Sequence, residues 1–297
     1  MKTLVHLSDL HFGRTDPEVV AALTASVEAA RPDLIAVSGD LTQRARAWQF
    51  KEARKFLGGL PRVPHIVVPG NHDVPLWNFF KRFAGPLDNF RRYITDDLEP
   101  FYADEEVVVI GVNTARSLTT KYGRINERQI ARMRKRFCAY ADDVTKIVVT
   151  HHPFDVPEGH ERELVGRAVL AMEALAACGA DVLLAGHLHL AHTGHTAKRY
   201  RIEGHSALVV QAGTAASTRI RGEANSFNVL KIRHPFVNVV RLAWQEAQKT
   251  FTTASSEHFR HTPEGWERVP DEMAADITYE EGAGGPPANA AAGAPGA

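Results

Sequence analysis

The stretch PHIVVPGNHD, residues 64–73, joins an apolar run to a group of polar side chains. The run at residues 64–68 is rich in Ile and Val and predicts a short buried strand. Asn71, His72 and Asp73 follow directly after Gly70, where that strand ends. Polar side chains of three different chemistries at the end of one strand indicate a functional site in which they have separate roles.

Similar apolar runs recur up to residue 185. They predict buried strands at residues 3–8, 33–38, 64–68, 107–112, 144–149 and 181–185. Segments with helical spacing lie between them, and Trp48, Phe50 and Phe56 would share one apolar face, as would Val169 and Met172. Strands that alternate with helices predict crossover connections and a sheet that is mainly parallel at its centre.

Closely spaced strands are expected after residue 190. They are predicted at residues 201–204, 206–212, 225–233 and 236–244. Hairpins of this kind favour a second, antiparallel layer.

The same patterns divide the chain into three parts. We expect a catalytic domain at residues 1–250 and an extension at residues 251–281, which packs loosely or on that domain because its apolar pattern is weaker. Residues 282–297 consist of Gly, Ala and Pro with one Asn. They predict a disordered tail, since almost no side chain there can be buried.

The composition is that of a globular protein, with 297 residues of which 44% are hydrophobic. Thirty-five Lys and Arg residues balance thirty-five Asp and Glu residues. The chain therefore lacks the overall basic field that attracts proteins to nucleic acids, and no extended nucleic-acid surface is expected. No apolar run approaches the roughly 18 residues that a membrane helix needs, so no membrane span is predicted.

The two cysteines, Cys138 and Cys178, lie in helix-like segments without the spacing of metal ligands. We interpret both as small buried hydrophobic residues, which is typical of a reducing compartment. The first residues do not resemble a signal peptide, because Asp9 and His11 interrupt a short apolar run. The expected location is the cytoplasm.

Side chains of metal-binding type follow five of the predicted strands. They are Asp9 and His11, Asp40, Asn71, His151, and His187 with His189. The carboxyl ends of parallel strands meet at one edge of a sheet, where folds of this class bind ligands. These oxygen and nitrogen donors, without a thiolate, suit two divalent ions of Mn, Fe or Zn better than Ca or Mg.

The chain resembles the calcineurin-like metallophosphoesterase superfamily over about residues 3–245. The signature of that superfamily stands here as Asp9-Leu10-His11, Gly39-Asp40, Gly70-Asn71-His72, His151 and Gly186-His187-Leu188-His189. The resemblance implies an α/β fold, a four-layer α/β/β/α sandwich of two mixed sheets flanked by helices. It also implies one metal site of Asp9, His11 and His189 and a second of Asn71, His151 and His187, with Asp40 bridging the two.

By the same resemblance, a hydroxide that bridges the two metal ions attacks phosphorus in line with the departing oxygen. His72 would face the substrate as a cationic stabiliser or general acid, with a structural histidine as the alternative. Asp73 would orient His72 and stabilise its charge. A small anion clamp for the substrate, or else a set of solvated loop charges, would consist of Arg44, Arg46, Arg116, Lys121 and Arg124.

The segments SGDLTQRA and His151-His152-Pro153 look most like class III cyclic nucleotide phosphodiesterases. The implied function is hydrolysis of a small phosphodiester, such as a cyclic nucleotide of the 3′,5′-cyclic AMP type. Alternatives are a glycerophosphodiester, a lipid precursor like UDP-diacylglucosamine, an Mre11-like nuclease and a non-catalytic interaction module. Lipid A hydrolases typically carry arginine where His72 stands, and a nuclease should show a basic strip. The expected partner is the small-molecule substrate, with a homodimer left open.

Overall fold

The computed structural model describes residues 1–76, 78–218, 222–270 and 273, and contains two β-sheets that face each other. The seven-stranded sheet comprises, in spatial order, β13 (Gly265–Val269), β12 (Thr250–Thr262), β11 (Phe236–Gln245), β10 (Ser226–Arg233), β1 (Lys2–Leu7), β2 (Leu34–Ser38) and β3 (His65–Val68). The six-stranded sheet comprises β4 (Phe101–Ala103), β5 (Val107–Val112), β6 (Thr145–Thr150), β7 (Val182–Ala185), β9 (Leu208–Gln211) and β8 (His192–His195).

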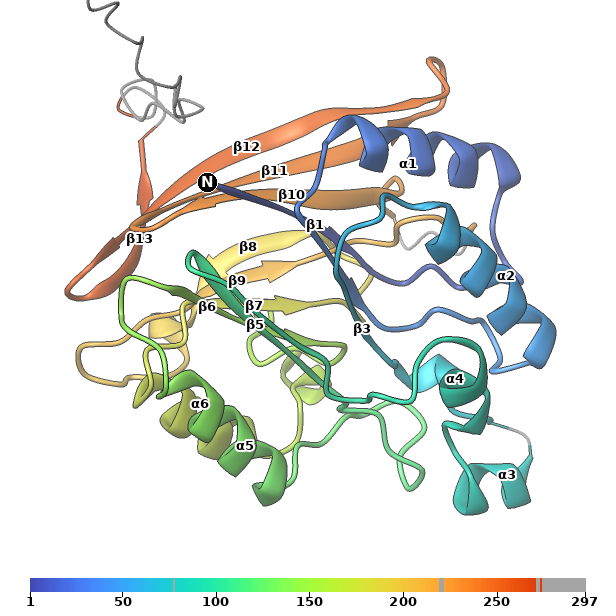
Figure 1. Ribbon diagram of the computed structural model, residues 1–297, viewed down its shortest axis with the longest axis horizontal. Coiled ribbons are helices and arrows are strands. Elements are labelled where there is room, and N and C mark those ends of the chain that lie inside the picture. Colours follow the sequence, from blue (N-terminus) through green and yellow to red (C-terminus); the bar gives the residue numbers. More distant parts are fainter. Residues whose placement is uncertain (77, 219–221, 271–272, 274–297) are drawn as a thin grey trace, which may run out of the picture.

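Helices cover the outer faces of both sheets (Figure 1). The α-helices are α1 (Pro17–Ala29), α2 (Ala47–Gly59), α3 (Phe79–Ala84), α4 (Asp88–Tyr93), α5 (Glu127–Phe137) and α6 (Ala168–Ala176). Short 3₁₀ turns form η1 (Asn71–Asp73), η2 (Glu161–Glu163) and η3 (Thr196–Lys198). Helices α1 and α2 lie on the seven-stranded sheet, and α5 and α6 lie on the six-stranded sheet. This arrangement confirms the expected four-layer fold.

Both sheets are parallel at the positions that the apolar runs predict. Strands β1, β2 and β3 run parallel, as do β5, β6 and β7. Strand β9, which the sequence assigned to the antiparallel layer, instead pairs parallel with β7. Every residue of β5 and β6 is buried, because one face of these strands meets the other sheet and the opposite face meets helices. Five strand ends that carry polar side chains therefore point to the same region between the sheets.

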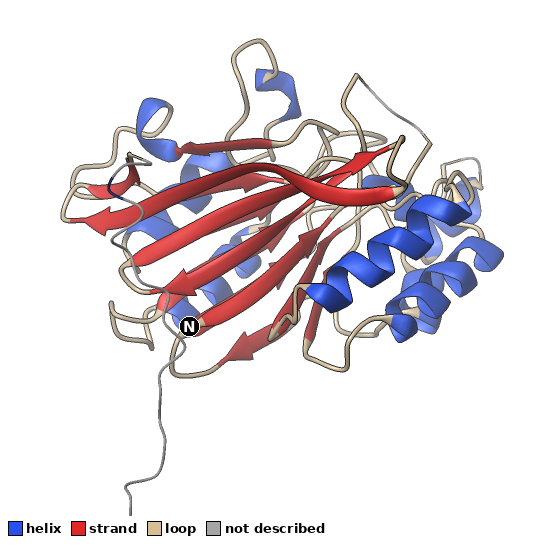
Figure 2. Ribbon diagram, turned by 90° about the horizontal axis from the view of Figure 1, so that it is seen from above, coloured by secondary structure: helices blue, strands red, loops and turns tan. Residues whose placement is uncertain are grey.

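The later strands differ from the prediction of a separate antiparallel layer. Strand β10 pairs antiparallel with β1, so the hairpins extend the same sheet as β1–β3, and its strands lie side by side in Figure 2. Residues 201–204 form no strand, whereas residues 192–195 form the edge strand β8.

Strands β12 and β13 continue the seven-stranded sheet beyond residue 250, where the sequence places the end of the catalytic domain. The sequence pattern misses β12 because most of its side chains are exposed or only partly buried. The expected tail at residues 282–297 lies outside the described residues.

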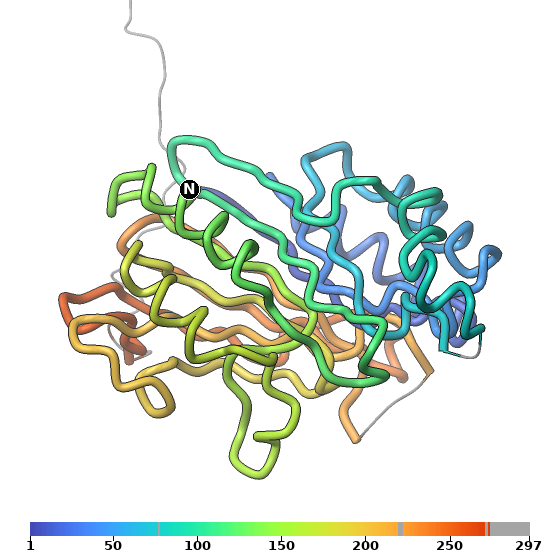
Figure 3. The backbone as a smooth tube through the Cα atoms, turned by 90° about the horizontal axis from the view of Figure 1, so that it is seen from below, coloured from blue at the N-terminus to red at the C-terminus, as the bar shows by residue number. Residues whose placement is uncertain are grey.

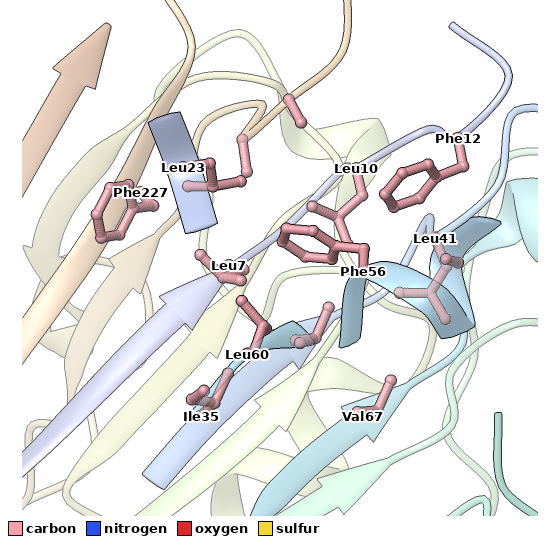
Figure 4. Packing of buried hydrophobic residues seen from close by; sticks show 14 of the residues in the cluster. Leu7, Leu10, Phe12, Leu23, Ile35, Leu41, Phe56, Leu60, Val67 and Phe227 are labelled. Carbon is pink, nitrogen blue, oxygen red and sulfur yellow. The ribbon is translucent and has the colours of Figure 1, made fainter. Parts of the chain in front are cut away.

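Three apolar clusters hold the layers together. Leu4 and Ile66 meet Ile147 and Val149 between the sheets. A second cluster packs α1 and α2 against the outer face of the seven-stranded sheet (Figure 4), and a third packs α5 and α6 against the six-stranded sheet. Each fully buried large aliphatic or aromatic side chain contributes roughly 1.5–3 kcal/mol.

The helical faces differ from the prediction at two positions. Trp48 is 46% exposed and Val169 is 62% exposed, so each lies off the buried face of its helix. Gln49 takes the buried position next to Phe50 on α2. None of the helices in the described ranges combines the length and the apolar character needed to cross a membrane.

The two cysteines form a disulfide bond between Cys138 and Cys178. Cys138 follows α5 and is exposed, whereas Cys178 follows α6 and is buried. The interpretation of both as free, buried thiols is therefore wrong, and with it the argument from the cysteines for a reducing compartment. Adjacent packing of α5 and α6 brings the two residues together, and no local sequence pattern reports that contact.

We expect the disulfide to stabilise the fold. The bond closes a loop between residues 40 positions apart, and loss of such a loop costs about 4 kcal/mol in the chain-entropy account. Cys138→Ser should lower the free energy of unfolding in denaturant by that order, and a reducing agent should bring the wild-type protein to the same value. Two reactive thiols in the denatured, unreduced protein would contradict the bond.

Candidate metal centre

The predicted ligands gather where five strands from both sheets end. They are Asp9 and His11 after β1, Asp40 after β2, Asn71 after β3, His151 after β6, and His187 and His189 after β7. Four groups of His and Asp side chains there bring possible ligand atoms within 4.8 Å of one another. The structure therefore unites residues that are up to 180 positions apart in the sequence.

The backbone at these positions is strained. Asp9, His11, Asp40, His187 and His189 have φ of 52°, 50°, 51°, 73° and 61°. Residues other than glycine adopt left-handed φ rarely, and such conformations persist where the surrounding structure enforces them, often at functional sites. Gly70 and Gly186 permit the crowding, since a Cβ on them would lie 2.2 Å from Asp40 Oδ1 and 1.8 Å from Ser8 Oγ.

Asp9, His11 and His189 form the first cluster. Asp9 Oδ1 lies 3.5 Å from Nε2 of His11 and 3.5 Å from Nε2 of His189. The other oxygen, Oδ2, accepts hydrogen bonds from Ser8 Oγ at 2.7 Å and from the His187 amide at 3.0 Å. Within the described part of the chain, the buried Asp9 Oδ1 and His11 Nε2 have no hydrogen-bond partner. This buried set of unused donor atoms fits a cation.

Asn71, His151 and His187 form the second cluster. Nε2 of His151 lies 3.1 Å from Asn71 Oδ1 and 3.3 Å from His187 Nδ1. His151 Nδ1 donates to the carbonyl oxygen of Ser38 at 2.8 Å, so its Nε2 is directed into the cluster. The side-chain nitrogen Nδ2 of Asn71 donates to the Thr120 carbonyl at 3.3 Å, and this bond turns Oδ1 toward the cluster. The nitrogen and oxygen donors again suit a divalent transition metal.

Asp40 lies between the two clusters. Its Oδ2 is 3.8 Å from His11 Nε2 and 3.4 Å from His151 Nε2. Its Oδ1 accepts a hydrogen bond from the His72 amide at 2.8 Å. The carboxylate is 1% exposed, and its position is that of a group shared by two cations.

The electrostatics of the site favour positive charge. Burial raises the pKa of Asp40, but the charges of His151 and His72 outweigh burial and hold that pKa well below its usual value. Burial lowers the pKa of His151, but the charge of Asp40 dominates and raises it to about 9. A proton on His151 compensates the carboxylates when no metal is bound, and a metal ion would displace it.

His72 lies beside the clusters at the wall of a cavity. A ring nitrogen of His72 is within 4.8 Å of ligand atoms of His11 and Asp40. Its Nδ1 donates to the carbonyl oxygen of Gln43 at 2.9 Å. This hydrogen bond fixes the ring orientation and places the accepting nitrogen of the neutral ring at Nε2.

Asp73 accepts hydrogen bonds from the backbone of two loops beside the site. Its carboxylate accepts hydrogen bonds from the amides of Leu41, Thr42 and Gly70 at 3.1, 2.9 and 3.0 Å and from Thr42 Oγ1 at 2.9 Å. Asp73 thus holds the loop after Asp40 against the turn that carries Asn71. Its predicted role as the support of His72 stays a prediction.

The cavity above the clusters has a volume of about 540 Å³. Its lining consists of Asp40, Gln43, Arg44, Asn71, His72, Val74, Leu76, Thr120, Lys121, His160, Glu163, His187, Leu188 and His189. Of the predicted anion clamp, Arg44 and Lys121 lie in this lining, whereas Arg46, Arg116 and Arg124 do not. Arg116 instead donates to the carbonyls of Asn113 and Ala115 and to Gln129 Oε1, and so stabilises its own loop.

Four other histidines have different surroundings. His152 is buried, accepts from Thr114 Oγ1 at 2.7 Å and donates from Nε2 to the Lys121 carbonyl at 2.9 Å. His6 contacts Ser38 Oγ at 2.8 Å inside the sheet. His192 and His195 line a different cavity, beside β12 and β13.

Sequence reasoning missed three residues that contact the predicted ligands. Ser8 donates to Asp9, and Thr214 Oγ1 lies 2.6 Å from His189 Nδ1. Glu163 Oε2 lies 3.0 Å from His187 Nε2. Ser8 could have been suspected from its place beside Asp9. Thr214 lies in a loop and Glu163 in a short 3₁₀ turn, and neither segment has a distinctive sequence pattern.

Comparisons with known proteins agree with this geometry. Residues 2–191 match the family model described as Calcineurin-like phosphoesterase. A segment of 83 residues is 36% identical to the glycerophosphodiester phosphodiesterase GpdQ of Enterobacter lignolyticus (strain SCF1), covering 24% of this chain and 29% of GpdQ. The chain thus aligns with less than a third of that relative.

A solved structure with little sequence similarity shows the same fold. The structure of purple acid phosphatase PPD1 from yellow lupin (Lupinus luteus) seeds superposes with a TM-score of 0.63 at 12% identity, covering 86% of this chain and 53% of PPD1. Vacuolar Protein Sorting 29 from Cryptosporidium parvum gives a TM-score of 0.48 at 12% identity, covering 87% of this chain and 98% of that protein. Since the family match runs from β1 through both predicted metal clusters, the chain belongs to the calcineurin-like phosphoesterase family.

Proposed function

We propose that this protein is a phosphodiesterase that hydrolyses a small phosphodiester with two divalent metal ions. The observation that carries the proposal is the place of Asp40, whose Oδ2 lies between His11 and His151 at the base of an open cavity. A carboxylate shared by two donor clusters is the arrangement that a dinuclear site requires.

Each cluster would hold one ion of Mn, Fe or Zn. Asp9, His11 and His189 would hold the first, Asn71, His151 and His187 the second, and Asp40 would contact both. When bound, two such ions supply Lewis acidity and lower the pKa of water near them. The buried carboxylates and the hydrogen bonds to Ser8, Ser38 and Thr214 keep the ligand side chains oriented.

His72 would contact the substrate. Its Nδ1 proton is directed to the Gln43 carbonyl, so protonation of Nε2 makes the ring an imidazolium beside the cavity. The cation can stabilise charge on the phosphoryl oxygens or give its Nε2 proton to the leaving oxygen. Two observations support this role. The His72 ring lines the cavity, and its Nδ1 is already the donor to the Gln43 carbonyl.

The cavity suits a small substrate. Its volume of about 540 Å³ fits one phosphodiester with modest substituents, and Arg44 supplies positive charge in the lining, whereas the ammonium of Lys121 is paired with Glu163. So small a basic group matches one phosphate rather than a nucleic-acid strand, which would need a longer basic and aromatic surface.

Two substrate classes have specific support. The segments SGDLTQRA and His151-His152-Pro153 favour a cyclic nucleotide, and the similarity to GpdQ favours a glycerophosphodiester. Both are diesters whose hydrolysis leaves an alkyl alcohol, so the same site chemistry serves either one.

A substrate panel tests the proposal. Purified protein with added Mn²⁺ should hydrolyse bis-p-nitrophenyl phosphate and prefer either glycerophosphodiesters or cyclic nucleotides over DNA and nucleotide-sugar diphosphates. Asp40→Ala should lower the rate at least about 10²-fold, the scale of losing one strong electrostatic contact in a transition state. Asp96→Ala, which removes an exposed carboxylate, is the matched control. Full activity in folded Asp40→Ala, or a preference for DNA, would contradict the assignment.

A comparison of leaving groups tests His72. As general acid, His72 should matter most for diesters that release an alkyl alcohol, since p-nitrophenolate leaves without a proton. His72→Ala is expected to lower kcat about 10²–10⁴-fold on an alkyl diester and much less on bis-p-nitrophenyl phosphate. Equal losses on both substrates would leave charge stabilisation as its role and refute proton donation.

A further inference from the structure

The loop between β6 and α6 brings an acidic residue into the metal centre. This segment projects from the body of the molecule and is drawn in yellow-green in Figure 3. It carries the 3₁₀ turn η2, and Glu163 at the end of that turn lines the cavity together with His187. The Glu163 side chain is only 14% exposed, so the loop places it inside the site.

Glu163 determines which nitrogen of His187 faces the second cluster. Its Oε2 lies 3.0 Å from His187 Nε2, and an ionised carboxylate can only accept a hydrogen bond. His187 must therefore carry its proton at Nε2. The lone pair then resides on Nδ1, which lies 3.3 Å from His151 Nε2 and faces the second metal cluster.

Lys121 balances the charge of Glu163. Its ammonium pairs with Oε1 of Glu163, while Oε2 remains on His187. A carboxylate beside an anion-binding cavity would repel the substrate, and the ammonium offsets this repulsion. The backbone of Lys121 is anchored separately, because its carbonyl accepts from His152 Nε2 at 2.9 Å. Glu163 therefore has two distinct partners, one for charge and one for orientation.

We propose that Glu163 is a positioning residue that holds His187 in the Nε2–H tautomer and directs Nδ1 to the second metal ion. The inference rests on the proposed dinuclear function. In metalloprotein sites, a carboxylate that accepts from the outer nitrogen of a ligating histidine orients the ring and increases its basicity. Removal of such a group typically weakens metal binding about 10–100-fold.

Calorimetric titration of MnCl₂ into the metal-free, full-length protein tests this role without relying on activity. The wild-type protein should bind two ions. Glu163→Ala should weaken one of the two binding steps about 10–100-fold and leave the other nearly unchanged. Glu163→Gln, whose side-chain oxygen can still accept from Nε2, should restore most of the affinity. Nitrogen NMR of the metal-free wild type should show His187 protonated at Nε2, and Glu163→Ala should lose this preference.

Two further variants separate the Glu163–His187 hydrogen bond from the other charges of the loop. Glu161→Ala removes an exposed carboxylate from the same turn and should bind Mn²⁺ like the wild type. Lys121→Met removes the ion pair but keeps the acceptor for His187, so it should weaken Mn²⁺ binding far less than Glu163→Ala.

The outcomes distinguish the two proposals. Two unchanged binding steps in Glu163→Ala, or equal losses in Glu163→Ala and Glu163→Gln, would overturn the positioning role while the proposed function stood. A loss in Lys121→Met as large as that in Glu163→Ala would also overturn it. A wild-type protein that neither binds Mn²⁺ nor hydrolyses any diester would refute the proposed function and this inference together.

Discussion

The buried carboxylate of Asp40 is the group on which the rest of the site depends. It lies between His11, which follows a strand of one sheet, and His151, which follows a strand of the other. A carboxylate that is 1% exposed is unfavourable unless positive charge surrounds it. The strand ends of both sheets therefore supply the histidines around this charge.

The backbone is strained where the predicted ligands meet. Five of the predicted ligands have left-handed φ, a conformation that costs of order 1–3 kcal/mol for each such residue. The apolar cluster between the sheets and the two clusters on their outer faces provide the packing that maintains it. Asp73 contributes locally, because its carboxylate ties the loop after Asp40 to Gly70.

Much of the site could be predicted from the sequence because its main determinants are local. Buried parallel strands appear in the sequence as apolar runs. Each run ends at the edge of the sheet, and polar residues follow it, as between Val68 and Asn71. The parallel centre and the convergence of the seven predicted ligand residues follow from that pattern together with the recognised signature.

What the sequence could not predict depends on contacts between distant segments. Backbone groups orient the side chains of Asp73 and Arg116, and the spacing of apolar residues in the sequence gives no sign of these contacts. The pairing of Cys138 with Cys178 depends on how α5 and α6 pack. The half-exposed strand β12 has too few apolar residues to stand out.

The fold and the cavity lining come from different parts of the chain. The superposition on purple acid phosphatase PPD1 at 12% identity shows that the fold persists when most of the sequence differs. Fold alone does not assign a substrate. In this chain the cavity lining beyond the clusters comes from loops, among them Arg44, Lys121 and Glu163. Selectivity between phosphoester substrates is therefore expected to reside in these loops, and the strand ends supply the common chemistry.

The most direct test of the central claim is anomalous diffraction from crystals of the protein grown with Mn²⁺. Two anomalous peaks should appear on opposite sides of Asp40, one among Asp9, His11 and His189 and the other among Asn71, His151 and His187. A single peak remote from Asp40, or the absence of any peak at a Mn²⁺ concentration that supports hydrolysis, would contradict the dinuclear account.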